Sequence, residues 1–465
     1  MKLFVEIITQ LFFVYMVGYT LITIISTFYS IIKLNNEHIY QQVTSKINFK
    51  PKTPPVSILV PAYNEEPTIL RTMASLLALD YEEYEIIVVN DGSSDKTMEK
   101  LLSTYEVKPV DKFVRQYIPC QPIEKIYEGE YNGVKLQFVD KKNGGKADAL
   151  NAGINLAHYE LFLSMDADSM LQHDSLYHIA TPYVRYDNVV AVGGSVKIAN
   201  QLTLNAQGEV EKIKLSKNPW ILFQTLEYFR AFLTTRIWFN RFNGNLIISG
   251  AFGLFKREAV IDVGGYTLGS IGEDMDLIVK LHSYYLKNKK PYRIEYNAQA
   301  ICWTQGPSNL RDLKTQRVRW HKGLIQSLMG HRYIFFNIKY GVVSIISYMY
   351  FLIYEMLNPI FILLAGLFSI FLVWQKMANF KFIIFFLSVY IVYLVVNSWA
   401  SLYLERYFFN YQLSFLERMK LVLFCILENI GFRQLNLYFK MVALLTIHKN
   451  TSWGTIKRYS EEEES

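Results

Sequence analysis

The sequence has few cysteines, and they are far apart. Cys120, Cys302 and Cys425 are its three cysteines, and no two of them form a Cys-x-x-Cys pair. Neither a disulfide framework nor a zinc site is therefore supported. The chain also lacks an evident internal repeat and any long low-complexity tract. Its one biased stretch is the acidic tail Glu461 to Glu464, which we expect to be solvated.

Acidic residues are outnumbered by basic ones, 41 to 48, and the formal net charge is +7. Such an excess can serve a nucleic acid, but hydrophobic residues make up 51% of this chain, which indicates that part of it lies in a membrane. We therefore expect the basic residues to meet anionic lipid headgroups and a phosphorylated ligand, and we expect no nucleic acid.

Charge is scarce over residues 1–33, where Glu6 is the only acidic side chain. This stretch exceeds the ~20 residues that span a bilayer and is too long for a signal-peptide core. We predict an N-terminal transmembrane helix over 1–33, followed by a linker over 34–55. Four lysines lie between residues 33 and 52, and the positive-inside rule then places the next domain in the cytoplasm.

Apolar character returns later in the chain, and we predict a C-terminal membrane region over 333–448. Residues 340–374 are apolar but contain a glutamate, an asparagine and a proline, so they form one bent span or a re-entrant piece followed by a span. Residues 380–404 form a clear span. Polar residues at the centre of 420–447 favour a hairpin or an interfacial element, and the tail 449–465 is expected in the cytoplasm. The number of crossings stays open.

Between residues 56 and 332, short apolar runs alternate with helical segments, which is the pattern of parallel βαβ units. Four of the expected strands, 56–60, 85–89, 136–139 and 161–165, are each followed by a polar loop. Because the carboxyl ends of parallel strands meet at one edge of a sheet, these loops share the edge where open α/β sheets bind ligands.

The loop after the fourth strand holds Asp166 and Asp168, separated by one residue. Mg2+ and Mn2+ prefer oxygen ligands and commonly bridge one or two carboxylates to a substrate diphosphate. A chain of this length contains roughly one Asp-x-Asp pair by chance. A second pair does occur, at Asp274 and Asp276, so the first pair becomes persuasive only through its neighbours.

Two further stretches, 218–240 and 308–330, are predicted interfacial helices of the same domain. In the second, Gln316, Arg319 and Trp320 have the spacing i, i+3 and i+4, so one helix face presents all three. An Arg fork suits a diphosphate, and an indole suits the apolar face of a sugar ring. The plain alternative is a basic interfacial helix with a Trp anchor. Arg317 is expected to face elsewhere and to meet lipid headgroups.

Together these motifs resemble the inverting, membrane-embedded family 2 glycosyltransferases, a group that includes cellulose, chitin, hyaluronan and poly-N-acetylglucosamine synthases. The resemblance covers about residues 56–330. It rests on six motifs in this order: Pro61-Ala62-Tyr63-Asn64-Glu65-Glu66, Asn90-Asp91-Gly92-Ser93-Ser94-Asp95, Gly144-Gly145-Lys146, Asp166-Ala167-Asp168, Glu273-Asp274 and Gln316-Arg317-Val318-Arg319-Trp320. Each motif is a modest signal, and their order and spacing make the set a strong one.

The resemblance assigns Tyr63, Glu65 and Asp91 to the uridine of a sugar nucleotide. An aromatic face can stack on a base, and a carboxylate can accept the uracil imide proton or the ribose hydroxyls. The alternative for Asp91 is an ordinary turn after a strand. Lys146, at a helix start beside two glycines, would meet the donor through its ammonium. The alternative for Lys146 is a simple helix-entry loop.

The resemblance also assigns Asp166 and Asp168 to the donor ribose and the metal, with Asp168 as the direct ligand of Mg2+ or Mn2+. Such a metal neutralises the diphosphate leaving group, where negative charge grows in the transition state. Glu273 and Asp274 match the acidic pair of the family, and Asp274 is the predicted base that deprotonates the acceptor hydroxyl. The plain alternative is that acidic residues are favoured at helix N-termini by the dipole.

The resemblance implies an α/β nucleotide-sugar-binding domain of the GT-A type over 56–332, docked on flanking transmembrane helices. It implies a processive β-glycosyltransferase that adds a hexose or N-acetylhexosamine from a UDP-sugar to a growing polysaccharide, with export across a bacterial-type inner or plasma membrane. The Gln316-x-x-Arg319-Trp320 pattern is the mark of processive members. Within the family, the chain looks most similar to the poly-N-acetylglucosamine synthases.

Two alternatives stay open. One is a non-processive enzyme that glycosylates a lipid acceptor, such as diacylglycerol or a polyprenyl phosphate. The other is a non-catalytic membrane scaffold with a sugar-nucleotide fold, against which the presence of every acidic position argues. No sizeable domain follows the last hydrophobic stretch, so we do not expect a built-in cyclic-dinucleotide receptor domain. Regulation by a small membrane partner protein, the sugar and the linkage are left undetermined.

Overall fold

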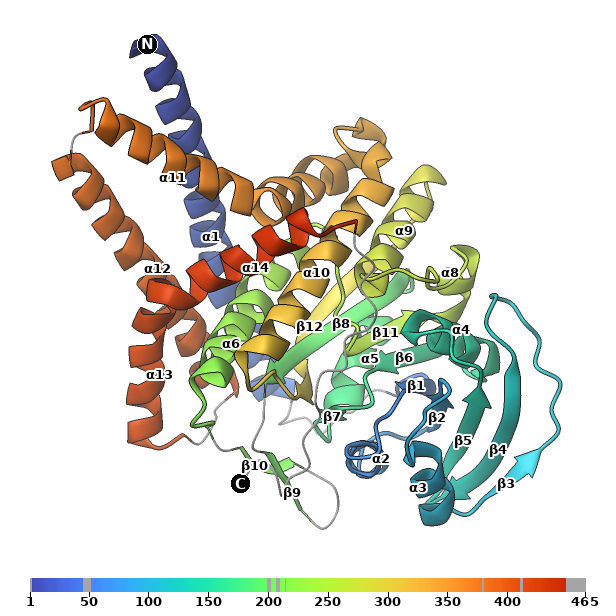
Figure 1. The fold of residues 1–465 in the computed structure, drawn as a ribbon. Helices are drawn as coiled ribbons and strands as arrows, with labels where there is room; N and C mark the ends of the chain where they lie inside the picture. Colours follow the sequence, from blue (N-terminus) through green and yellow to red (C-terminus); the bar gives the residue numbers. More distant parts are fainter. Residues whose placement is uncertain are drawn as a thin grey trace.

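Parallel strands form the centre of the molecule, as the alternating pattern predicts. The structure, a computed structural model, describes residues 2–44, 52–198, 202–205, 210–213, 215–378, 380–409 and 413–448. Within these ranges the main sheet has ten strands, in the order β3-β4-β5-β2-β1-β6-β11-β8-β12-β7 (Figure 1). The predicted cytoplasmic tail over 449–465 lies outside the described residues.

Four neighbouring strands of this sheet are parallel. They are β1 (Val56–Ala62), β2 (Tyr84–Asn90), β5 (Val134–Lys141) and β6 (Leu161–Met165). Each contains one of the strands predicted above, and their carboxyl ends meet at one edge of the sheet. They read as continuous apolar runs because helices cover both faces of the sheet. The predicted α/β fold is confirmed.

The other half of the sheet is mixed in direction. Antiparallel β11 (Phe252–Lys256) lies between β6 and β8 (Val189–Ile198), and β12 (Arg293–Thr304) runs parallel to β8 and antiparallel to β7 (Ser169–Leu171). The apolar stretch 247–255 has a strand-like pattern in the sequence, but it is a strand only from Phe252 onward. Its first part is a loop because the backbone of Gly250 bonds to side chains of the cleft instead of to a neighbouring strand.

The sequence of residues 106–135 has the character of a surface insertion, but this stretch extends the sheet. It forms β3 (Val107–Val110) and β4 (Ile123–Tyr131), which pair antiparallel beside β5. A separate two-stranded sheet contains β9 (Leu202–Leu204) and β10 (Val210–Ile213).

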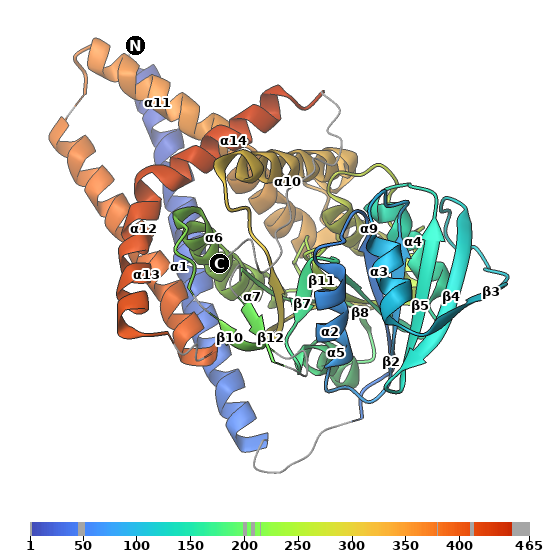
Figure 2. The ribbon, with the colours of Figure 1, turned by 60° about the horizontal axis from the view of Figure 1, so that its bottom comes forward.

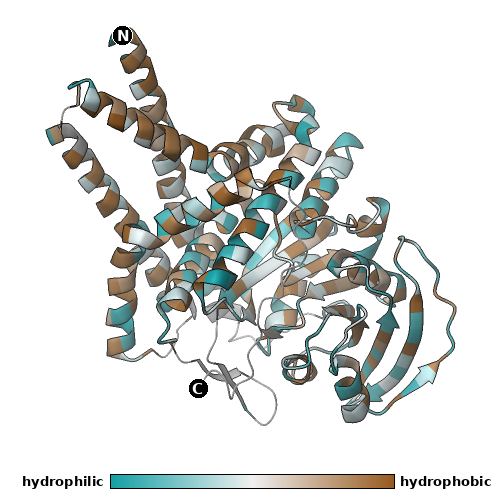
Figure 3. Cartoon of the chain, viewed as in Figure 1, coloured by the Kyte–Doolittle hydropathy of each residue, from teal (hydrophilic) through white to brown (hydrophobic). Residues whose placement is uncertain are grey.

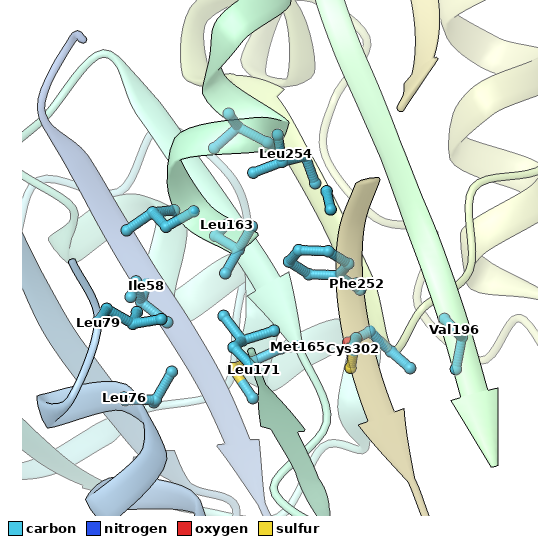
Figure 4. Close-up of a cluster of buried hydrophobic side chains, with 14 of the residues drawn as sticks. Ile58, Leu76, Leu79, Leu163, Met165, Leu171, Val196, Phe252, Leu254 and Cys302 are labelled. Atoms are coloured by element: carbon cyan, nitrogen blue, oxygen red, sulfur yellow. The ribbon is translucent and has the colours of Figure 1, made fainter. Parts of the chain in front are cut away.

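Helices cover the two faces of the main sheet and enclose two apolar cores (Figure 2). One face carries α4 (Lys146–Leu156), α8 (Arg257–Asp262) and α9 (Glu273–Lys287), and the other carries α2 (Ile69–Leu77), α3 (Thr97–Thr104) and α5 (Ser175–Arg185). Figure 4 shows Ile58, Leu163 and Phe252 from three strands within the second core. Each fully buried side chain of this kind contributes roughly 1.5–3 kcal/mol.

Two capped helices occupy the predicted interfacial ranges 218–240 and 308–330. The first begins at Pro219, where the side chain of Asn218 accepts a hydrogen bond from the Trp220 amide at 2.9 Å. It comprises α6 (Pro219–Arg230), a π-helical turn (Ala231–Thr235) and α7 (Arg236–Asn240). The second, α10 (Leu310–Gly330), is capped by the Asn309 side chain, which accepts from the Asp312 amide at 2.9 Å.

The most apolar helices are α1 (Lys2–Thr44), α11 (Asn358–Trp374) and α12 (Phe380–Phe409) (Figure 3). Among the described residues, two helical stretches, Lys2–Ile39 and Leu387–Tyr407, are long and apolar enough to cross a membrane. A third crossing exists if Val343–Met356 and Asn358–Trp374, which are bent by 51°, form one span. The protein is thus a membrane protein by the length and composition of its helices.

The N-terminal helix is longer than predicted. It continues past the expected end at residue 33 to Thr44, so the first part of the expected linker over 34–55 is helical. The extra turns are held by packing, since Leu34 is buried in the core of the α/β domain. Sequence hydropathy marks where a span becomes polar, and it does not mark where a helix with tertiary contacts ends.

The stretch 420–447 is not one clean crossing, as expected. It holds most of α13 (Phe415–Leu427) and all of α14 (Arg433–Leu445), joined by a break in which Gly431 has a φ of 124°. After this break, α14 packs along α10. Only glycine adopts such a backbone conformation readily, so Gly431 determines where the helix turns.

A buried ion pair joins the sheet to the membrane helices. Lys197 of β8 and Glu405 of α12 have side chains that are 2% and 3% exposed, and their charged atoms are 2.7 Å apart. Removing one member of such a pair leaves an uncompensated buried charge, which typically destabilises a protein by about 3–5 kcal/mol.

We therefore expect Lys197→Met to lower the thermal unfolding temperature of the detergent-solubilised chain, and the double change Lys197→Met with Glu405→Leu to restore most of it. The control is Lys256→Met, because Lys256 and Glu258 are a surface pair at 3.8 Å, worth about 1 kcal/mol or less. Equal effects of Lys197→Met and Lys256→Met in a thermal unfolding series would contradict the structural role of the buried pair.

Candidate active site

Loops at the carboxyl ends of the parallel strands face α9 and α10 across one cleft, which has a volume of about 950 Å3. All residues predicted for the site line this cleft: Tyr63, Glu65, Asp91, Lys146, Asp166, Asp168, Glu273, Asp274, Gln316, Arg319 and Trp320. The structure thus brings together motifs from both ends of the α/β domain. The role of each residue stays a prediction.

Lys146, the first residue of α4, links two of these motifs. Its ammonium forms an ion pair with Asp166 and lies 3.6 Å from the carboxylate of Glu273. Burial disfavours the charge on Lys146, but the neighbouring carboxylates outweigh it and raise the pKa of Lys146 above its usual value. The ammonium therefore stays charged between the strand that ends at Met165 and the helix that begins at Glu273.

Gly250 connects the same ammonium to the predicted base. The carbonyl of Gly250 accepts a hydrogen bond from Lys146 at 3.1 Å, and its amide donates to the carboxylate of Asp274 at 3.1 Å. A Cβ atom at this position would lie 2.9 Å from the Lys146 ammonium nitrogen. A side chain at position 250 would therefore displace the Lys146 ammonium from its present position.

Glu273 and Asp274 form the first turn of α9, where the positive end of the helix dipole favours acidic side chains. Burial raises the pKa of Glu273, and the charge of Lys146 opposes this shift. The turn is held against α10 by a contact between two glycines. A Cβ atom on Gly272 would lie 2.9 Å from the Cα of Gly323, so neither helix can carry a side chain there. Through this contact the acidic pair and Trp320, one turn earlier on α10, line the same cleft.

Asp91 organises the loop that leads to Lys146. Its carboxylate accepts hydrogen bonds from the amides of Gly144 at 3.0 Å and Gly145 at 2.7 Å. The same carboxylate pairs with the buried ammonium of Lys141, which also pairs with Asp148 at 2.6 Å. Asp91 therefore holds the glycine loop, and its contact with uridine stays a prediction.

Tyr63 and Glu65 follow β1 at one end of the cleft. The Tyr63 side chain is half exposed, so its ring is available for stacking on a planar ligand. The Glu65 carboxylate is buried and accepts a hydrogen bond from the Thr68 hydroxyl at 2.7 Å. The Tyr63 ring is therefore exposed to a ligand in the cleft, whereas the Glu65 carboxylate is bonded within the protein.

Arg317 does not face lipid headgroups, contrary to expectation. It is 8% exposed and forms two hydrogen bonds to the carboxylate of Glu227 on α6, at 3.1 and 2.8 Å. Its guanidinium carbon lies 4.5 Å from the centre of the Trp320 ring, which Tyr228 also approaches at 6.3 Å. Trp320 is therefore held on one side by a fixed cation, while 41% of it stays exposed in the cleft.

Comparison with known proteins identifies the family. The model of "Glycosyl transferase family 2" matches residues 57–116, and that of "Glycosyltransferase like family 2" matches residues 120–323. Together these matches cover more than half of the chain. The chain belongs to glycosyltransferase family 2. The predicted family is thereby confirmed, and every motif of the cleft lies within or beside the matched residues.

Curated relatives include poly-beta-1,6-N-acetyl-D-glucosamine synthases from two staphylococci. The chain is 33% identical to the Staphylococcus aureus (strain COL) protein over 269 residues, which is 58% of this chain and 54% of that one. It is 32% identical to the Staphylococcus epidermidis protein over the same shares. The chain thus spans about half the length of the curated relatives it matches.

Among solved structures, the chain is similar to a mannosyltransferase from Pyrobaculum calidifontis, solved with GDP-Man and Mn2+. The TM-score is 0.50 at 16% identity, over 92% of this chain and all of that one. At this level of identity the likeness concerns the fold alone. It agrees with the predicted GT-A type of the α/β domain.

The donor atoms in this family 2 site suit a divalent metal that is shared with a substrate. Asp166 and Asp168 offer carboxylate oxygens from one loop at the edge of the cleft. Within the described ranges, no group of three or more His, Cys, Asp or Glu side chains could hold a metal ion. Mg2+ and Mn2+ commonly bind through one or two carboxylates and substrate phosphates, so this pair fits such an ion.

Sequence reasoning missed three features of the site: the Arg317–Glu227 pair, the Gly272–Gly323 contact and the Asp91–Lys141 pair. One signal for the first was present, because Arg317 and Trp320 are three residues apart and share a helix face. Glu227 carried no signal, since its partner lies on a different helix. The glycine contact could not be found from spacing for the same reason.

We expect Arg317→Lys to weaken acceptor binding by about tenfold, because lysine keeps the charge but loses both the bidentate pair and the stacking on Trp320. The measurement is the Michaelis constant for the acceptor in a glycosyl transfer assay, with the constant for the donor determined in parallel. Arg311→Lys, at the exposed start of α10, is the matched control. Unchanged acceptor binding in Arg317→Lys would show that the pair does not support Trp320.

Proposed function

We propose that the chain is an inverting β-glycosyltransferase that transfers a hexose or N-acetylhexosamine from a UDP-sugar to a growing polysaccharide. One observation carries the proposal: the carboxylates predicted to bind the donor, the predicted base Asp274 and Trp320 line a single cleft. Family membership makes sugar transfer the expected chemistry. The names of the 33% and 32% identical relatives favour N-acetylglucosamine as the first sugar to test.

The donor would bind along the strand ends. In this proposal Tyr63 stacks on the uracil, with Glu65 and Asp91 beside the uridine, while Asp166 contacts the ribose. Asp168 would hold Mg2+ or Mn2+, which supplies positive charge to the diphosphate.

Lys146, Gln316 and Arg319 line the same cleft. Arg319 and Gln316 would donate hydrogen bonds to the phosphate oxygens, and the Lys146 ammonium would add a second positive charge nearby.

The transfer step would use Asp274 as its base. The acceptor hydroxyl loses its proton to the Asp274 carboxylate while its oxygen forms a bond to the anomeric carbon of the donor. The bond between that carbon and the diphosphate breaks, and UDP leaves with the electron pair. Because the new bond forms on the side opposite the leaving group, the configuration inverts. The amide of Gly250, which donates a hydrogen bond to Asp274 at 3.1 Å, would hold the carboxylate in a fixed orientation.

The part of the cleft lined by membrane-region residues supports a polymeric product. Besides Trp320, the lining includes Phe351 and Glu355, which belong to the bent helix pair of the membrane region. Glu355 pairs with Lys440 of α14 at 3.0 Å, so polar groups continue from the site toward the apolar helices. A sugar chain leaving Trp320 in that direction would enter the membrane region, which is consistent with export during synthesis.

The arrangement in the cell is part of the same proposal. The lysines that follow the first helix favour a cytoplasmic α/β domain, where UDP-sugars are made. The membrane region would then carry the product outward. A small membrane partner protein would bind to the membrane helices if one takes part.

The catalytic role of Asp274 has a direct test. We expect Asp274→Asn to keep UDP binding and to lower the transfer rate by at least about 100-fold, the usual contribution of a general base. Asp276→Asn is the matched control, since Asp276 lies on the same helix but pairs with His331 at 2.9 Å, away from the acidic pair. If Asp274→Asn retained most of the activity in a UDP-release assay, Asp274 would not be the base.

The product distinguishes the proposed function from its alternatives. Purified full chain with a panel of labelled UDP-sugars and Mn2+ is expected to release UDP and to form a ladder of polymer lengths. A single sugar on a lipid would establish the glycolipid alternative. Intact UDP binding without turnover of any donor would favour a non-catalytic scaffold. Digestion of a polymer with linkage-specific glycosidases then identifies its linkage.

A further inference from the structure

A short segment after α10 exposes apolar side chains on one side of the molecule. We call residues 332–346 the 332–346 ridge. It consists of the short helices Arg332–Ile334 and Ile338–Tyr340 and the start of Val343–Tyr348. Phe336 is 62% exposed and Ile338 is 82% exposed. Single exposed apolar residues are ordinary, but a contiguous group of them marks an interaction site.

The backbone conformation of the ridge is a second indication of an interaction site. Phe336 has a φ of 48°, a left-handed conformation that a bulky residue rarely adopts. The strain is not offset by burial of the Phe336 ring, because that ring is largely exposed. A conformation of this kind persists where the surrounding structure enforces it, and it often marks a functional contact.

The inner side of the ridge is firmly attached to the rest of the domain. Ile334 and Tyr340 are buried in the same apolar cluster as Met275 and Val279 of α9. The Ser344 hydroxyl closes the turn by donating to the carbonyl of Ile334 at 2.6 Å. The ridge is therefore a rigid projection, with one packed face and one apolar exposed face.

Polar contacts tie the ridge to the helix that carries the predicted base. The Tyr333 hydroxyl donates to the Ser283 hydroxyl at 2.9 Å, and His331, just before the ridge, is 2.9 Å from Asp276. Both partners lie on α9, which begins at Glu273. A contact that immobilises the ridge therefore also restrains α9.

The two charged residues within the ridge are both basic. Arg332 and Lys339 are exposed within it, and the sequence contains no Asp or Glu between Asp312 and Glu355. The exposed lysines 287, 289 and 290 lie at the end of α9, which rises beside the ridge in Figure 1. Basic and aromatic residues together are typical of surfaces that meet anionic lipid.

The ridge is also continuous with the membrane region. Its last residues, including the exposed Ile345 and Ile346, belong to the stretch Val343–Met356, the first half of the bent pair that has the length and composition of a span. The chain thus passes from the ridge directly into apolar helices. A bilayer surface fits this position better than a soluble partner does.

We propose that the 332–346 ridge inserts Phe335, Phe336 and Ile338 into the boundary between headgroups and acyl chains of an anionic bilayer. Arg332 and Lys339 then pair with lipid phosphates. Because the ridge is bonded to α9, this contact fixes the start of α9 at a set height above the membrane. The inference concerns membrane attachment and stands whether or not the proposed sugar transfer is correct.

The test places a nitroxide spin label at position 336. The full chain with Phe336→Cys, in a Cys120→Ser background, is reconstituted into bilayers of phosphatidylcholine and phosphatidylglycerol in equal amounts. Accessibility of the label to oxygen, which concentrates in lipid, is compared with accessibility to a water-soluble nickel chelate. The matched control is Phe113→Cys, a residue that is 93% exposed in the loop between β3 and β4.

We expect the label at position 336 to be reached by oxygen and protected from nickel, and the label at position 113 to show the reverse. Equal nickel accessibility at both positions overturns the proposal, because the ridge would then lie in water. Protection of position 336 from both reagents also overturns it, because another protein surface would cover the ridge.

The charges are tested separately with Arg332→Gln and Lys339→Gln together. In the anionic bilayer this double variant is expected to raise nickel accessibility at position 336, and in pure phosphatidylcholine it is expected to change nothing. An equal rise in nickel accessibility in both bilayers would contradict pairing with lipid phosphates. The rise would then reflect disturbed folding of the ridge.

Discussion

The ammonium of Lys146 is the interaction on which the cleft depends. It sits between the carboxylate of Asp166, at the end of a central strand, and that of Glu273, at the start of α9. Without a cation at this point, acidic side chains from two motifs would face each other across a partly buried space, and their repulsion would separate the sheet edge from α9. Gly250 extends the link to Asp274 through its two backbone groups. One lysine thus sets the distance between the predicted donor side and the predicted base.

Buried charges recur where the α/β domain meets the membrane helices. Lys197 pairs with Glu405 at 2.7 Å, and Arg230 pairs with Glu428 at 2.5 Å, each joining the domain to a helix of the C-terminal region. Apolar contacts are not directional, so they define the relative position of the domain and the membrane helices less strictly. A buried charge must keep its partner, so each ion pair fixes one relative position. The ridge after α10 adds a third attachment, made to lipid in our proposal. These attachments give the cleft a fixed orientation relative to the membrane helices.

Much of the fold followed from the sequence because its signals are local. Parallel strands buried on both faces read as apolar runs, and the loops after them carry the chemistry, so β1, β2, β5 and β6 and their loops were predictable. The strand ends brought Asp91, Lys146 and Asp168 to one edge as expected. Errors arose where a tertiary contact overrode the local pattern. The first helix continued past residue 33 because Leu34 is buried, and the residues before Phe252 left the sheet because Gly250 bonds to side chains.

The sequence by itself determined the family, the α/β domain, the order of the motifs and the presence of membrane helices, because each depends on residues close together in the chain. Only the tertiary structure decided which of those residues touch. It turned Arg317 inward to Glu227, engaged Asp91 with the glycine loop, and brought α9 to α10 through two glycines. These contacts join segments that are distant in sequence. Their pairing depends on shape and charge in three dimensions, which no local pattern of residues encodes.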